Sequence, residues 1–359
     1  MPTSVDPAVP ADPVRATEQW FVRRGLPYFV PSERAAVRAA LQPRRTVPLL
    51  VATVLAALGV AVLVAWLSED LTAAPATLTL VGVLAAVAYA VTALRARPIV
   101  TWAVTRTLSS LTLLLPMATR ALPLLLVFVT FLFINAEVWQ VAATLDGGVL
   151  WLTVLLFSVM GIGFFVVRLP EELDRVDHEL DPGRIAVICE DTPLAAEASR
   201  LARDRGDDLV REAAVSGYER GNLVTALVVT QLVQVMLLSL SVFIFFLLFG
   251  VITMQDTVVS AWIGGPTHHV PGLENVSVEL VQVSVFLAAF SGLYFTVYAV
   301  TDETYRDQFF TGVMAELERA VAVRAAYTLL NEERRVADAD ATVEMEPAPK
   351  RPTEGPPAP

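Results

Sequence analysis

Six stretches of the chain are long and apolar enough to cross a lipid bilayer. A hydrocarbon core about 30 Å thick requires roughly 20 residues of helix at about 1.5 Å each. Lipid also offers a backbone no hydrogen-bond partners outside a helix or a closed barrel. The six stretches cover approximately residues 47–67, 73–94, 121–143, 149–169, 224–250 and 280–300. The pattern predicts an all-α fold, a polytopic membrane helical bundle of six transmembrane helices.

Basic residues occur only on alternate connections between these stretches. All 26 Lys and Arg residues lie in four segments, 1–46, 95–120, 168–222 and 301–359. The connections 68–72, 144–148 and 251–279 hold none. Because Lys and Arg close to a span stay on the cytoplasmic side of the membrane, this distribution predicts that both termini are cytoplasmic (N-in/C-in).

A seventh span over residues 98–118 is the main alternative to this topology. It would invert every later loop and place the arginines of 168–222 outside. The stretch also mixes Arg106 and Thr105 with Trp102 and Leu108, a pattern typical of an amphipathic helix. We therefore interpret 98–118 as an interfacial helix on the cytoplasmic face.

The polar segments complete the predicted organisation of the chain. Asp12 and Ser32 are suited to cap short helices near the N-terminus, and about 50 residues of acidic loop are marginal for an independent core. The predicted parts are cytoplasmic N-terminal helices over 1–46, transmembrane helices 1–4 over 47–169, an acidic cytoplasmic loop over 170–222, transmembrane helices 5 and 6 over 223–300, a cytoplasmic helix over 301–335 and a disordered tail over 336–359.

The amino-acid composition and the absence of known motifs limit the partners and reactions that we expect. Hydrophobic residues make up 55 % of the chain, and the net charge of -11 argues against a nucleic acid partner. Cys189 is the only cysteine, so no intramolecular disulfide can form. The sequence shows no nucleophile elbow, phosphate-binding glycine loop or metalloprotease helix. We therefore expect no cofactor and no enzymatic activity.

Four blocks of sequence carry a resemblance to known proteins. They are WFVRRGLPYFV at 20–30, RALPLLLVFVTFLFINAEVWQVA at 120–142, ERGNLVTALVVTQLVQVMLLSLSVFIFFLLFG at 219–250 and VYAVTDETYRDQFF at 297–310. Together they resemble a family of uncharacterised actinobacterial multi-pass integral membrane proteins, over somewhat under half of the chain. The resemblance implies a location in the cell membrane and implies no catalytic residues.

Polar residues within the predicted spans are the candidate functional site. An ionisable group at the centre of a span costs about 2.5 to 3.5 kcal/mol, so such groups are often functional. Glu137 is the acidic candidate, with Asn135 and Gln140 beside it. On a continuous helix it lies about 24 Å from residue 121, towards the outer surface. It is either a carboxylate linked to an ion or substrate, or an interfacial carboxylate hydrogen-bonded to a neighbouring helix or water.

The fifth and sixth predicted spans contribute further candidates. Gln231 and Gln234 share one helix face, while Ser284, Ser291 and Tyr298 recur every seven residues. Such stripes either line a water-filled path or form helix contacts.

The longest external loop contains the adjacent residues His268 and His269, together with Asp256, Glu274 and Glu279. These residue types can bind zinc or copper. Adjacent histidines reach one metal only if the backbone bends between them, so we expect a solvated loop and no metal site.

Three functions remain open. The favoured one is a non-enzymatic membrane scaffold or assembly component in contact with the lipid bilayer and with protein partners at the cytoplasmic face. The alternative is a transporter or cation channel that uses the polar residues of transmembrane helices 3, 5 and 6. A membrane-embedded enzyme is the third, and the oligomeric state is not predicted.

Overall fold

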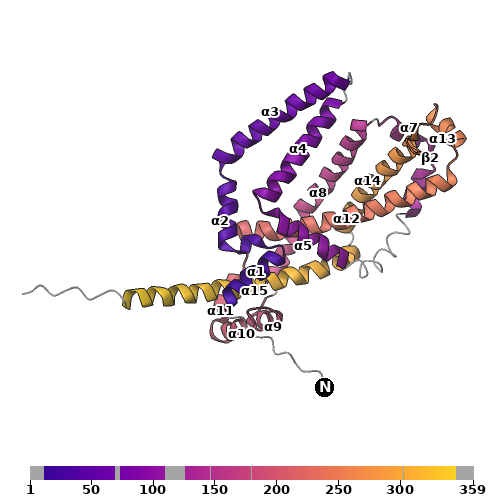
Figure 1. The fold of residues 1–359 in the computed structure, drawn as a ribbon. Helices are drawn as coiled ribbons and strands as arrows, with labels where there is room; N and C mark the ends of the chain where they lie inside the picture. The colour runs from indigo at the N-terminus through magenta and orange to yellow at the C-terminus, as the bar shows by residue number, and fades with distance from the viewer. Residues whose placement is uncertain are drawn as a thin grey trace, which may run out of the picture. The chain divides into compact units, whose positions relative to one another are not determined.

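The computed structural model describes residues 12–68, 73–109, 126–145, 147–178, 180–301 and 303–344 (Figure 1). Nearly all of these residues are helical, which confirms the all-α prediction. The chain divides into two compact units. We call Met1–Gln19, Glu179–Val215 and Glu318–Pro359 the polar unit, and Trp20–His178 with Ser216–Leu317 the apolar unit.

Four helices of the apolar unit are long and apolar enough to cross a membrane. They are α3 (Pro43–Ser68), α8 (Gly147–His178), α12 (Gly217–Thr253) and α14 (Val278–Thr301). Two further pairs of helical segments qualify only if each bent pair is counted as one span, which brings the total to six. The structure therefore supports a helical membrane protein with four to six spans.

The first bent pair joins α4 (Ala73–Thr92) to α5 (Ala96–Ser109), with 97° between Leu80–Thr92 and Ala96–Ser109. Arg95 at the corner has a φ of 52°, a left-handed conformation that few non-glycine residues adopt. The corner separates the second predicted span from the predicted interfacial helix. Of that helix, residues 110–118 lie outside the described residues.

The second bent pair interrupts the third predicted span. Helix Leu126–Phe133 and α7 (Ala136–Ala143) meet at 73°. Asn135 accounts for the break, because its side chain accepts a hydrogen bond from the Glu137 backbone N–H and so begins a new helix. The prediction of one continuous helix over 121–143 was wrong within the described residues, and the depth of Glu137 derived from it does not hold.

The core of the apolar unit lies where α7, α12 and α14 meet. Phe133 stacks on Phe246 with ring centroids 4.8 Å apart, and the Trp139 indole donates a hydrogen bond of 2.7 Å to the Phe133 carbonyl. Val283 and Leu287 of α14 complete this buried cluster. The cluster fixes α7 against the two long helices.

Beyond α12, the chain forms α13 (Asp256–Ile263) and a small antiparallel hairpin before it enters α14. The hairpin strands are β1 (His269–Val270) and β2 (Leu273–Ser277). Gly272 in the turn has a φ of 85°, which explains why glycine occupies that position.

The N-terminal part of the chain is helical, as predicted. It forms α1 (Pro13–Arg23), a short 3-10 turn η1 (Pro27–Phe29) and α2 (Pro31–Ala40). Asp12 caps α1 as expected, since its Oδ1 accepts from the Val14 N–H at 3.2 Å. The cap assigned to Ser32 was wrong, because α2 begins at Pro31 after Val30 and has no side-chain cap.

The polar unit contains three short helices from the predicted acidic loop. These are α9 (Pro182–Ile188), α10 (Ala195–Asp204) and α11 (Gly206–Ala213), and they bury Ile185, Leu201 and Leu209 completely. The loop shares its unit with the C-terminal part of α15 (Glu303–Glu344). Because α15 continues to Glu344, the prediction of disorder was wrong for 336–344, and 345–359 lie outside the described residues.

Candidate functional site

The residues around Glu137 hold the local backbone in place. Asn135 caps α7, and the Gln140 side chain donates a hydrogen bond of 2.9 Å to the Trp262 carbonyl of α13. Glu137 itself is exposed in the first turn of α7, where a carboxylate is favoured by the helix dipole. This geometry favours the interpretation of Glu137 as an interfacial carboxylate.

Two glycines give the register between α12 and α14. A Cβ on Gly250 would meet the Leu280 side chain, and a Cβ on Gly292 would meet Val235 and Ser239. The two helices are therefore antiparallel. A residue of α12 faces the residue of α14 for which the two residue numbers add up to about 530. Gln231 and Gln234 lie near the level of Tyr298.

Ser284 does not join the two glutamines. It lies 14 residues before Tyr298 on α14, which places it about 21 Å away along the helix axis. The Ser291 hydroxyl is already bonded to the Leu287 carbonyl at 2.6 Å, and Tyr298 stacks on Tyr294 with centroids 6.2 Å apart. The predicted stripe is therefore spread along α14 and does not converge on one point.

Gln231 is the most unusual polar residue of the apolar unit. It is completely buried, and within the described part of the chain neither its Oε1 nor its Nε2 has a hydrogen-bond partner. Gln234 Oε1, Ser284 Oγ and Thr107 Oγ1 share this property. A buried group without a partner costs about 1 to 3 kcal/mol, so such a group either stores strain or binds something polar.

A buried polar anchor that the sequence reasoning missed lies near the start of α12. Asn222 is fully buried, and its amide accepts from the Tyr28 N–H at 2.8 Å and donates to the Gly25 carbonyl at 3.0 Å. Arg34 forms an ion pair with Glu219 one turn earlier. The sequence did contain a signal for this anchor, since Glu219 and Asn222 are three residues apart and directly precede the apolar run of α12.

This anchor holds the aromatic segment at 20–30 in position, because both backbone partners of Asn222 belong to that segment. Phe21 and Phe29 are completely buried and their rings meet edge-on at 5.2 Å, so these side chains pack against protein. Tyr28 donates to the Leu94 carbonyl at 2.6 Å, and burial raises the pKa of its phenol. Arg24 forms an ion pair with Glu316.

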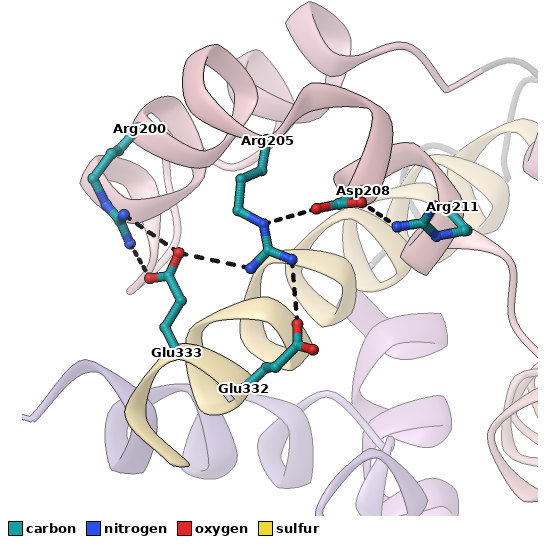
Figure 2. Close-up of polar contacts among 6 residues, drawn as sticks. All are labelled: Arg200, Arg205, Asp208, Arg211, Glu332 and Glu333. Carbon is teal, nitrogen blue, oxygen red and sulfur yellow. Dashed lines mark hydrogen bonds and ion pairs between the residues drawn. The ribbon is translucent and has the colours of Figure 1, made fainter. Parts of the chain in front are cut away.

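The polar unit is joined by a network of arginines and carboxylates, shown in Figure 2. Arg200 on α10 contacts Glu333 on α15 at 2.6 Å. Arg205 reaches Glu332 and Glu333 on the same helix and Asp208 on α11 at 2.8 Å. Figure 2 shows Arg205 at the centre of this arrangement. The network ties the loop helices to α15.

The ion pairs of this network change the pKa values of Asp208 and Arg200. The hydrogen bond from Arg205 lowers the pKa of Asp208, and the one to Glu333 raises the pKa of Arg200. Both shifts keep the groups ionised. Because each guanidinium faces a carboxylate, the network has a structural role and offers no free acid or base for chemistry.

Cys189 is not a nucleophile in this fold. It is completely buried in the polar unit, and desolvation raises the pKa of its thiol to about 12. The thiol therefore stays protonated at neutral pH, where only a thiolate would react.

Metal binding has no support among the described residues. No group of three or more His, Cys, Asp or Glu side chains is arranged to hold an ion. His268 and His269 contact different carboxylates, Glu279 and Asp256. Both histidines are exposed, as expected for a solvated loop, and each imidazole also contacts one carboxylate.

No protein-family model, curated protein or solved structure matches this chain. The resemblance to actinobacterial membrane proteins stays a prediction.

Proposed function

We propose that this chain is a non-enzymatic integral membrane protein that assembles with other proteins through its polar unit. One observation carries the proposal. The residues expected to form an intramembrane site are spread over α7, α12 and α14, whereas the polar unit is a folded helical module with a buried core and an inert thiol. Such a module is suited to binding another protein.

The proposed topology has six crossings with both termini in the cytoplasm. In this arrangement α4 is the second crossing, α5 lies in the interface, and the bent pair that ends in α7 is the third. The absence of Lys and Arg from 251–279, against their abundance in 168–222, supports this orientation. The polar unit then faces the cytoplasm of the cell.

The surface of the loop helices favours a basic partner. Its exposed acidic side chains include Glu190, Asp191, Asp204 and Asp207. Exposed basic residues are fewer, and two of them, Arg184 and Arg211, already pair with carboxylates of the same unit. Charge complementarity would then bring the partner to this face and make the complex sensitive to salt.

A pulldown in mild detergent tests the proposal. The wild-type chain should retain a reproducible partner that is lost at high salt and in the double variant Asp204→Lys/Asp207→Lys. Arg203→Glu is the matched control, because it changes an adjacent exposed charge in the opposite direction and should leave the partner bound. Recovery of the chain alone under several conditions, or equal losses in both variants, would refute the proposed role.

A transporter or cation channel is the second candidate, favoured by the buried amide of Gln231. If this amide lines a polar path, Gln231→Leu should abolish flux in proteoliposomes. If the amide is only an unsatisfied core group, the same substitution removes a cost of about 1 to 3 kcal/mol and should raise the midpoint of thermal unfolding. Gln282→Leu is the control, since it breaks a bond to the Leu145 carbonyl and should destabilise.

A further inference from the structure

The hairpin between α12 and α14 places two adjacent histidines against two different helices. His268 Nδ1 lies 2.8 Å from Glu279 Oε1 in the first turn of α14. His269 Nε2 lies 3.3 Å from Asp256 Oδ2 in the first turn of α13. Because successive residues of an extended chain point to opposite sides, this arrangement joins the hairpin to both helices at once.

Glu279 is the buried member of the first pair. Its side chain is only 6 % exposed, whereas the His268 side chain is 73 % exposed. The His268 backbone N–H also donates to both carboxylate oxygens, at 3.1 and 3.2 Å. A carboxylate held this far from water is costly unless a positive charge or several donors compensate it. The backbone N–H and the imidazole Nδ1 of His268 are the groups that contact this carboxylate.

Among the described residues of the hairpin, α7 and α13, no Lys or Arg offers these carboxylates a permanent positive charge. Between Arg220 and Arg306 the sequence contains no Lys or Arg. The other described titratable side chains on the elements packed here are acidic: Glu137 on α7, Asp256 on α13 and Glu274 on β2. Among the described residues of β1, β2, α7 and α13, His268 and His269 are the only side chains that can become cationic.

We propose that this hairpin is a proton-sensitive clamp. Protonation of His268 and His269 strengthens the contacts to Glu279 and Asp256 and holds β1 against α14 and α13. An imidazole changes its charge between about pH 5 and 8. The added stability is therefore present at the acidic end of this range and is lost as the pH rises through it.

The clamp is connected to the rest of the apolar unit through α13. The rings of Trp262 on α13 and Trp139 on α7 meet at 5.9 Å, and Gln140 of α7 donates to the Trp262 carbonyl. Asp256 and Trp262 belong to the same eight-residue helix, so release of His269 from Asp256 removes one of the contacts that position α13. This inference does not depend on the proposed assembly function.

Hydrogen exchange of the full-length protein in detergent, measured by mass spectrometry and corrected for intrinsic rates, tests the clamp. Amides of residues 264–279 should lose protection by about twofold to fivefold between pH 6 and pH 8, the range expected for one partly exposed ion pair. In His268→Gln/His269→Gln, protection should be lower at pH 6 and nearly independent of pH.

The third histidine provides the matched control. The chain contains only three histidines, so His178→Gln should keep the full pH response of the hairpin. Glu279→Gln should weaken the response while leaving both imidazoles in place. A wild-type hairpin whose protection does not change between pH 6 and pH 8 would overturn the proposal, as would an unchanged response in the double histidine variant.

Discussion

At the scale of single residues, the most informative features are buried polar groups. Their burial and their hydrogen-bond partners are apparent only in the folded structure. Gln231 and Asn222 are both fully buried on α12, yet the amide of Asn222 is bonded to two backbone groups whereas that of Gln231 has no partner among the described residues. The sequence placed Gln231 on the correct helix. It could not separate the two cases, since both depend on segments distant in the chain.

Asn222 should be the more important of these residues for stability. Asn222→Ala leaves the Gly25 carbonyl and the Tyr28 N–H without their side-chain partner, at a cost of about 1 to 3 kcal/mol. The midpoint of thermal unfolding in detergent should fall clearly. Thr225→Ala, at an exposed position on the same helix, should leave it nearly unchanged. Equal midpoints for the two variants would show that Asn222 does not anchor the N-terminal segment.

Cys189 provides a probe of the polar unit because it is the only cysteine in the chain. Burial raises the pKa of its thiol to about 12, so the native protein should not react with iodoacetamide at pH 8 and should react fully once unfolded. The exposed position in Ala214→Cys should be labelled at once. Rapid labelling of Cys189 in the native wild-type protein would contradict the buried core described for this unit.

At the scale of elements, the long apolar stretches predicted the positions of α3, α8, α12 and α14. They did not predict where helices break. Residues 121–143 are apolar enough for a span, but Asn135 begins a new helix within them by capping α7. Asparagine is a favoured capping residue, so FINAEVW contained the signal that a strong hydropathy pattern obscured. The hairpin of β1 and β2 was missed because two short strands leave little periodicity to detect.

The ion pairs of Asp208 with Arg205 and Arg211, at the start of α11, should weaken in acid. Arg205 lowers the pKa of Asp208 below its ordinary value of 3.8, so the stabilisation is present above that pH and is lost as the pH falls through the lowered value. Protection of the α10 and α11 amides from hydrogen exchange, corrected for intrinsic exchange rates, should therefore decrease below about pH 4. Asp208→Asn should be less protected at pH 6 and show a smaller further loss of protection in acid. An identical acid response in both proteins would exclude this pair as its source.

At the scale of the whole molecule, the apolar stretches predicted a helical membrane protein, and the structure has four to six helices that are long and apolar enough to cross a membrane. From the sequence alone, the acidic loop and the C-terminal helix were predicted to be separate appendages. The structure places both in one compact unit, because Leu201 and Leu209 are buried there and arginines of the loop pair with carboxylates of α15. Such pairing joins residues more than a hundred positions apart, which local patterns do not reveal.

The central claim is that the polar unit faces the cytoplasm while the β1–β2 hairpin faces outward. Labelling of intact cells with a membrane-impermeant maleimide tests it directly. Two single-cysteine additions are suited to the test, Asn275→Cys on the hairpin and Ala214→Cys in the polar unit, since both positions are exposed and native Cys189 is buried. Asn275→Cys should be labelled in intact cells, and Ala214→Cys only after permeabilisation. The reverse pattern, or labelling of both in intact cells, would contradict the proposed topology and the assembly role that depends on it.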